Sequence, residues 1–113
     1  MKSEGNRDLF PGALEMMILR TLKIKPLHGY ALTQHIKSAS DDLLQIEEGS
    51  LYPALQRLLK QGLVKAHWGT SARNRRVRIY QLTAAGTKHL EQEVSKFEKM
   101  LEGITRVLRP VES

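Results

Sequence analysis

The chain has 113 residues, 41% of them apolar, and a formal net charge of +6, which suits a single domain with one modest core. It contains no cysteine, so disulfides, thiolate metal sites and a cysteine nucleophile are excluded. No apolar stretch approaches the roughly 18 residues that a membrane-spanning helix needs, and the polar residues 1–8 lack the apolar core of a signal peptide. We therefore expect a cytoplasmic protein without membrane contact.

The positive charge is concentrated in the first three-quarters of the chain. Residues 1–83 carry thirteen Lys/Arg and seven Asp/Glu, whereas residues 84–113 carry five of each. Such an asymmetry favours a polyanionic partner.

Two helices are predicted in the first part of the chain. Residues 1–9 are expected to form a flexible arm. Helical spacing of apolar residues begins after Pro11 and Gly12, and it must stop before Pro26, because the residue before a proline is pushed out of the α region. A second helix is predicted over about residues 29–38, and residues 43–46 are expected to form a short strand.

The best-marked helix is predicted to follow Ser50. Serine is a good N-cap, and this assignment places Leu51, Tyr52 and Pro53 at the first three helical positions, where proline costs little. Apolar residues recur at helical spacing as far as residue 59. Gly62 is a natural residue to end the helix.

A β-hairpin with a cationic tip is predicted for residues 63–83. Residues 63–68 alternate apolar and polar side chains, residues 69–72 break the pattern, and residues 77–83 form a second extended run. Between Lys65 and Tyr80 there are five Lys/Arg and no acidic residue. A loop of that charge repels itself, so we expect it to bind something negative. A cationic hairpin directly after a helical segment indicates the wing of a winged-helix DNA-binding domain.

The last predicted helix begins after Thr83, a suitable N-cap, and ends before Pro110. Apolar residues recur at alternating intervals of four and three, which forms an a/d stripe of Leu90, Val94, Phe97, Leu101, Ile104 and Leu108. A helix of about 25 residues is about 40 Å long, whereas a core of about 75 residues has a radius of gyration of roughly 11 Å. The core cannot cover the whole stripe, so we expect a homodimer through this helix.

The fold class predicted from these elements is mainly α with a small β component (α+β). It is a winged helix-turn-helix with a long C-terminal dimerisation helix. Residues 1–9 are the arm, residues 10–83 the winged-helix domain, residues 84–109 the dimerisation helix and residues 110–113 a tail.

Four sequence blocks resemble the PadR family of bacterial transcriptional regulators. The order and spacing of the blocks match over residues 10–90, and they are Pro26-Leu27-His28-Gly29-Tyr30, Glu48-Gly49-Ser50-Leu51-Tyr52-Pro53-Ala54-Leu55, Trp68-Gly69 and Arg78-Ile79-Tyr80-Gln81-Leu82-Thr83-Ala84-Ala85-Gly86. The resemblance implies a winged-helix fold, an operator DNA partner, a homodimer built by the C-terminal helix and usually repression. A single terminal helix is typical of the short subfamily.

The candidate DNA contacts lie on the third helix, which the resemblance makes the recognition helix, and on the wing. Tyr52 can donate its hydroxyl to a phosphate or pack on the hairpin, Gln56 can pair with adenine and Arg57 with guanine. Arginines of the tip can enter a narrow minor groove or pair with phosphates. Of Arg78 and Tyr80, one is expected to reach phosphate while the other packs inward. The full set is Ser50, Tyr52, Pro53, Gln56, Arg57, Lys60, Arg73, Asn74, Arg75, Arg76, Arg78 and Tyr80.

No motif indicates catalysis, since the chain has no nucleophile elbow, phosphate-binding glycine loop or zinc-protease helix. The four histidines are too scattered for a metal site, so we expect neither a metal nor a cofactor in a protein that is not an enzyme. The favoured function is a sequence-specific repressor that acts as a homodimer on a palindromic operator. One alternative is a protein-interaction adaptor whose coiled coil recruits another chain. Another is a sensor that holds an aromatic or drug effector at the dimer interface, which no residue pattern supports.

Overall fold

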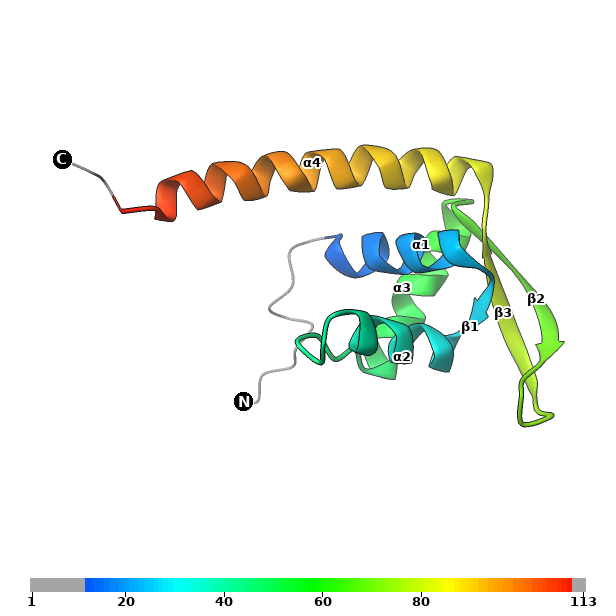
Figure 1. Cartoon of the computed structure of the whole chain (residues 1–113). Helices are drawn as coiled ribbons and strands as arrows, with labels where there is room; N and C mark the ends of the chain where they lie inside the picture. The colour runs from blue at the N-terminus through cyan, green and yellow to red at the C-terminus, as the bar shows by residue number, and fades with distance from the viewer. Residues whose placement is uncertain (1–11, 111–113) are drawn as a thin grey trace.

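The computed structural model describes residues 12–110. Within this range the elements follow one another as α1 (Ala13–Ile24), β1 (Leu27–His28), α2 (Gly29–Ala39), α3 (Glu48–Lys60), β2 (Val64–Thr70), β3 (Arg76–Leu82) and α4 (Ala84–Leu108). The first three helices pack together beside the sheet, and α4 runs across α1 and projects beyond it (Figure 1). This arrangement confirms the predicted winged helix-turn-helix with a long C-terminal helix. The predicted arm over residues 1–9 lies outside the described residues.

The core lies between the first three helices and one face of the sheet. Helices α1, α2 and α3 supply its most deeply buried side chains, which are Ile18, Leu19, Leu32, Leu51, Leu55 and Leu58. Burying an aliphatic side chain of this size contributes about 1.5–3 kcal/mol. Because α3 buries its leucine face, its opposite face is turned toward solvent.

Helix α3 begins earlier than the predicted N-cap at Ser50. Glu47 is the N-cap residue, and the backbone N–H groups of Ser50 and Leu51 both donate to the Glu47 carbonyl at 3.0 Å. Ser50 therefore lies in the first turn, and Pro53 lies inside the helix instead of among its first three residues. The prediction was wrong because Ser50 satisfies the side-chain preference of an N-cap, whereas backbone bonds to Glu47 decide where the helix starts.

The predicted strand at residues 43–46 is also wrong. These residues form an irregular connection in which Ile46 is buried and Leu43 is exposed. The additional strand is β1, which comprises only two residues and pairs antiparallel with β3. The sheet order is β1-β3-β2, and this order ties the start of α2 to the hairpin.

The chain reverses sharply between α3 and the hairpin at Gly62, which has a φ of 73°. The Gly62 N–H donates to the Leu59 carbonyl and the Leu63 N–H donates to the Leu58 carbonyl, each at 3.0 Å. These two bonds form a Schellman motif, in which glycine adopts the left-handed conformation without strain. The predicted role of Gly62 is confirmed, and Leu63 enters the base of the hairpin directly.

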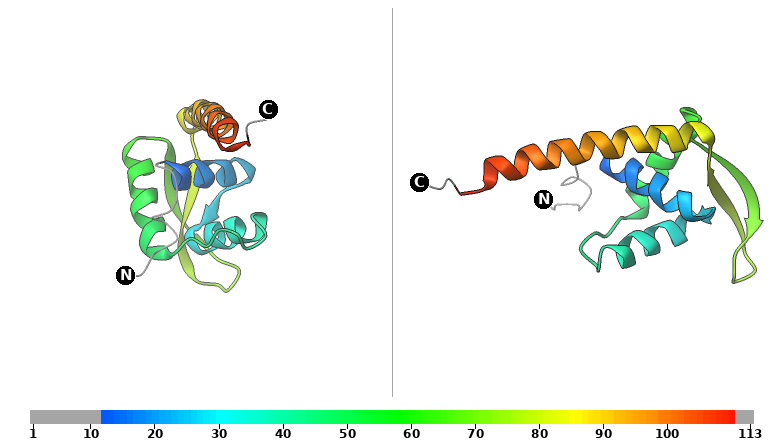
Figure 2. Two further views of the ribbon diagram at one scale, coloured as in Figure 1. Left: turned by 90° about the vertical axis from the view of Figure 1, so that its left-hand side faces the viewer. Right: turned by 45° about the horizontal axis from the view of Figure 1, so that its top comes forward.

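Helix α4 begins at the predicted cap, where the Thr83 Oγ1 accepts a hydrogen bond from the Gly86 N–H at 3.0 Å. Its first half packs on α1, so that Leu90 is buried and Val94 is half-buried. Its second half extends past the domain (Figure 2), where Leu101 is 45% and Leu108 is 75% exposed. None of the helices in residues 12–110 is both long and apolar enough to cross a membrane.

Candidate nucleic-acid interface

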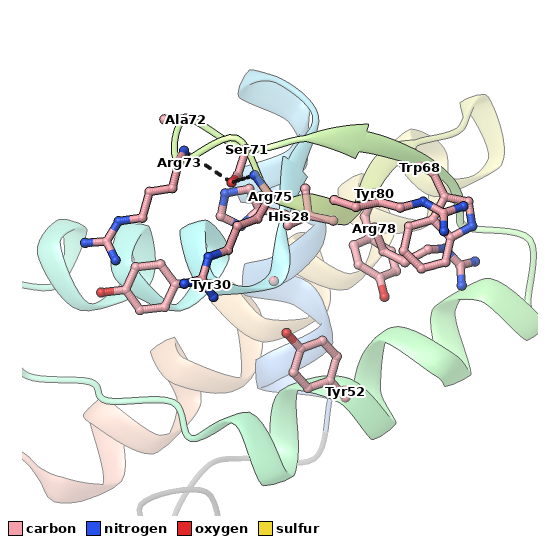
Figure 3. Close-up of a pocket in the computed structure, with 13 residues that line it drawn as sticks. His28, Tyr30, Tyr52, Trp68, Ser71, Ala72, Arg73, Arg75, Arg78 and Tyr80 are labelled. Atoms are coloured by element: carbon pink, nitrogen blue, oxygen red, sulfur yellow. Dashed lines mark hydrogen bonds between the residues drawn. The ribbon is translucent and has the colours of Figure 1, made fainter.

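A groove of about 850 Å³ lies between the β2–β3 hairpin and the N-terminal ends of α2 and α3 (Figure 3). Aromatic and arginine side chains dominate its lining, and no Asp or Glu of residues 12–110 takes part in it. The lining residues are His28, Gly29, Tyr30, Tyr52, Trp68, Ser71, Ala72, Arg73, Arg75, Arg76, Val77, Arg78 and Tyr80. A concave surface with charge of one sign attracts a partner of the opposite sign.

One face of the hairpin packs into the core near its base and lines the groove toward its tip. The register pairs Ala66 with Tyr80, Trp68 with Arg78 and Thr70 with Arg76, and alternate residues of a strand share a face. Near the base, Tyr80 is 3% exposed and belongs to the core. Toward the tip, the same face presents Trp68 and the two arginines to the groove. Of the predicted pair, Tyr80 therefore packs inward and Arg78 is exposed.

The tip of the hairpin is organised by Ser71. Its N–H donates to the Arg75 carbonyl at 2.8 Å, and its Oγ accepts from the backbone N–H groups of Arg73 and Arg75 at 3.3 Å. Asn74 has a φ of 63°, a left-handed conformation that asparagine tolerates better than most residues. Asn74 thus shapes the turn, while the side chains of Arg73 and Arg75 are left exposed.

Trp68 is 55% exposed and is stacked with two arginines. The Arg76 guanidinium carbon lies 4.2 Å from the ring centroid, and that of Arg78 lies 5.5 Å from it. Both distances lie within the range of cation–π attraction. The sequence pattern did not predict this cluster, because the three side chains meet only through the pairing register of β2 and β3.

Tyr52 projects from α3 into the groove (Figure 3). A Cβ at Gly29 would lie 2.5 Å from the Tyr52 hydroxyl oxygen, so the missing side chain of Gly29 leaves room for the phenol at the start of α2. Burial raises the pKa of Tyr52, and the Glu48 carboxylate and Tyr80 raise it further. The hydroxyl therefore stays protonated at neutral pH, so it can donate a hydrogen bond to an anion.

The outward face of α3 carries Pro53, Gln56 and Lys60, all of which are exposed, while Ser50 is half-buried. Arg57 differs from them because its guanidinium contacts the Glu15 carboxylate of α1 at 2.7 Å. Arg57 was predicted to pair with guanine, but part of its hydrogen-bonding capacity is used within the domain. No local sequence signal links these two residues, since they lie 42 positions apart.

Besides the Trp68 ring and the small or apolar residues that line the groove, His28 and Tyr30 were not among the predicted contacts. His28 Nδ1 accepts a hydrogen bond from the Ala31 N–H at 3.3 Å and so caps α2. Tyr30, in the first turn of α2, is exposed beside the tip. Both belong to the block at residues 26–30, which was a signal that could have identified them. Among residues 12–110 no three His, Asp or Glu side chains converge as a metal site requires.

The sequence and the fold are both similar to those of known proteins. The PadR-like family of transcriptional regulators matches residues 18–92, well over half of the chain. An uncharacterised protein X of Lysinibacillus sphaericus is 29% identical over 105 residues, which are 93% of this chain and 96% of that protein. A transcriptional regulator from Clostridium thermocellum is 28% identical with a TM-score of 0.80, and the match covers 88% of this chain and 96% of that one.

A further structure contains nucleic acid. Bacillus subtilis PadR, solved in complex with operator DNA, has a similar fold with a TM-score of 0.64 and 23% identity, over 72% of this chain and 47% of that one. The family match, which extends from α1 into α4, identifies the kind of protein. The chain belongs to the PadR-like family of transcriptional regulators and is a regulator of transcription, not an enzyme.

Proposed function

We propose that the protein binds duplex operator DNA sequence-specifically, as a homodimeric repressor acting in the cytoplasm. The observation that carries this proposal is the arginine-lined groove beside the exposed face of α3. Helix α3 would enter the major groove, as the second helix of a helix-turn-helix does. The hairpin would follow the adjacent backbone or minor groove, where arginine binds well. The operator complex of the Bacillus subtilis relative supports DNA as the ligand class.

The proposed contacts divide into base readers and phosphate ligands. Gln56 and Lys60 occupy the exposed face of α3, and amide and ammonium groups can both donate to base edges in the major groove. Tyr52 can donate its hydroxyl to a phosphate, and Ser50 and Pro53 lie in the same part of α3. The phosphate and minor-groove ligands are Arg73, Arg75, Arg76 and Arg78. Arg57 is held by Glu15 and Tyr80 is buried, so we expect each of them to contribute less to DNA binding.

The distal half of α4 supports the proposed dimer. Met100, Leu101, Val107 and Leu108 are large apolar side chains that the domain leaves exposed. Leu101 and Leu108 belong to the a/d stripe, and Met100 and Val107 lie directly beside it. This pattern suits helix-to-helix packing, and a second copy of the chain would cover these side chains. A dimer would place two copies of α3 against two half-sites, which is why we propose a palindromic operator.

The wing makes a first testable prediction. The double variant Arg75→Ala plus Arg76→Ala should bind every duplex sequence more weakly, because both cations neutralise phosphates in our proposal. The slope of log K against log salt should flatten by up to about 0.9 for each lost phosphate contact. Fluorescence anisotropy across a salt series measures both quantities. The matched control is Lys88→Ala plus Lys99→Ala, which removes the same charge from α4. A slope that the arginine variant leaves unchanged would contradict a DNA contact by the wing.

The Glu15–Arg57 pair makes a second prediction. Glu15→Gln should release the Arg57 guanidinium from α1, so that non-specific DNA affinity rises and the salt slope steepens by up to about 0.9 per protomer. Thermal stability should change little, because an exposed ion pair contributes only about 0–1 kcal/mol. Titration with competitor DNA measures the effect. Glu91→Gln removes the same charge from α4, and an equal change in both variants would show that Arg57 is not responsible.

A further inference from the structure

The Trp68 ring lies where the hairpin face leaves the core. Its register partner is Arg78, and the next pair toward the tip on the same face contains Arg76. The core part of this face ends with the pair Ala66 and Tyr80. Because Trp68 is more than half exposed, core packing does not explain a side chain of this size at this position. Its observed contacts are instead with two guanidinium groups.

Stacking on an aromatic ring leaves an arginine able to bind DNA. The ring covers the flat face of the guanidinium, whereas the five N–H donors point outward from its edge. No carboxylate of residues 12–110 forms an ion pair with Arg76 or Arg78. Arg57 shows the opposite case, because Glu15 accepts from its N–H groups directly. The contact with Trp68 therefore leaves the N–H donors of both arginines available.

We propose that Trp68 is a positioning residue, which holds Arg76 and Arg78 toward the groove in the orientation that receives a DNA phosphodiester strand. This inference rests on the proposed function. Arginine side chains are among those that lose most rotamer freedom when they are immobilised, and that loss opposes binding. A ring that already orders both arginines in the free protein reduces the rotamer freedom that they lose when DNA binds. The guanidinium charges attract the phosphodiester strand, and the Trp68 ring sets the direction in which the guanidinium groups point.

The test compares Trp68→Leu, Trp68→Tyr and the wild type on the same duplex across a salt series. Trp68→Leu should weaken binding roughly five- to thirtyfold, because two arginines must then be ordered on binding. Its salt slope should stay close to that of the wild type, because no cation is lost. Trp68→Tyr should restore most of the affinity, since a phenol ring also attracts a cation. Equal binding by the leucine variant, or no restoration by tyrosine, would overturn the inference. The melting temperature of each variant checks that it folds.

A double-mutant cycle separates positioning from direct contact. In a chain that already carries Arg76→Ala and Arg78→Ala, adding Trp68→Leu should change affinity by less than about twofold, because coupled residues act non-additively. The full loss in that background would mean that the ring contacts DNA itself and would overturn the positioning role.

Trp68 is the only tryptophan, so its fluorescence reports the stacking without DNA. Replacing both arginines with methionine should increase quenching by acrylamide, a neutral quencher, because the ring loses its cover. Unchanged quenching would show that the stack does not form in solution. Failure of the wild type to bind duplex DNA overturns the proposed function and this inference with it. Normal binding by both wild type and Trp68→Leu overturns the inference alone.

Discussion

Gly86→Ala is expected to lower the free energy of unfolding by about 3 kcal/mol, the upper end of the usual overpacking range. A Cβ at this position would overlap the backbone carbonyl oxygen of Leu63 and crowd Leu82. The same carbonyl accepts from the Thr83 N–H at 3.2 Å, and the Thr83 hydroxyl donates to the Gly62 carbonyl at 2.8 Å. Because backbone cannot rotate aside as a side chain can, the start of α4 would have to move away from the base of the hairpin.

Urea denaturation followed by circular dichroism measures this effect. Gly103→Ala in the same helix is the matched control, since a Cβ there would have no described atom within 4 Å apart from its chain neighbours and the backbone of its own helix. It should stabilise the protein by up to about 1 kcal/mol through helix propensity. If Gly86→Ala were as stable as the wild type, the close packing of α4 on the hairpin base would be refuted. Gly86, the last residue of the block at residues 78–86, is therefore glycine because a side chain does not fit there, and not because the backbone needs its flexibility.

Leu101→Lys is expected to convert the protein to monomers and to weaken operator binding about a hundredfold or more. Leu101 lies in the middle of the uncovered part of the α4 stripe, and in a homodimer the substitution places an ammonium from each chain in an apolar interface. A monomer binds one half-site, so it loses the gain of linked binding, which is typically on the order of 10²–10⁴. Folding should be kept, because Leu101 lies outside the buried core.

Sedimentation velocity and operator titration measure the two effects together. Ser95→Lys adds the same charge to an exposed position of α4 outside the stripe, and it should leave both quantities close to those of the wild type. A Leu101→Lys protein that sediments as the wild type does would contradict dimerisation through α4. Loss of the dimer with full operator affinity would instead separate dimerisation from DNA binding.

Features with local causes could be predicted from the sequence. The cap at Thr83 and the reversal at Gly62 depend on residues within one turn, and both are confirmed. The hairpin followed from alternation and from a run of turn residues. The start of α3 was missed because the prediction relied on the N-cap preference of Ser50, whereas backbone bonds to the Glu47 carbonyl place the N-cap at Glu47. Strand β1 has only two residues, and it exists through pairing with β3 some fifty positions later.

The candidate site likewise combines features that have local causes with features that depend on contacts between distant segments. The cationic tip could be predicted from composition alone, because the charge of an arginine does not depend on the conformation of the loop. The stacking of Arg76 and Arg78 on Trp68 depends on strand register, and the pairing of Arg57 with Glu15 depends on how α1 packs against α3. Neither follows from local pattern. The role of Asn74 in the turn required its backbone conformation, which composition does not give.

The most direct test of the central claim is binding of the purified protein to the DNA upstream of its own gene, titrated across salt in the presence of competitor DNA. A sequence-specific regulator should bind tightly there, resist unrelated competitor and show two protomers per operator. Weak binding at very low salt only, lost equally to any competitor, would contradict the proposed function and favour an adaptor that uses α4 to recruit another protein.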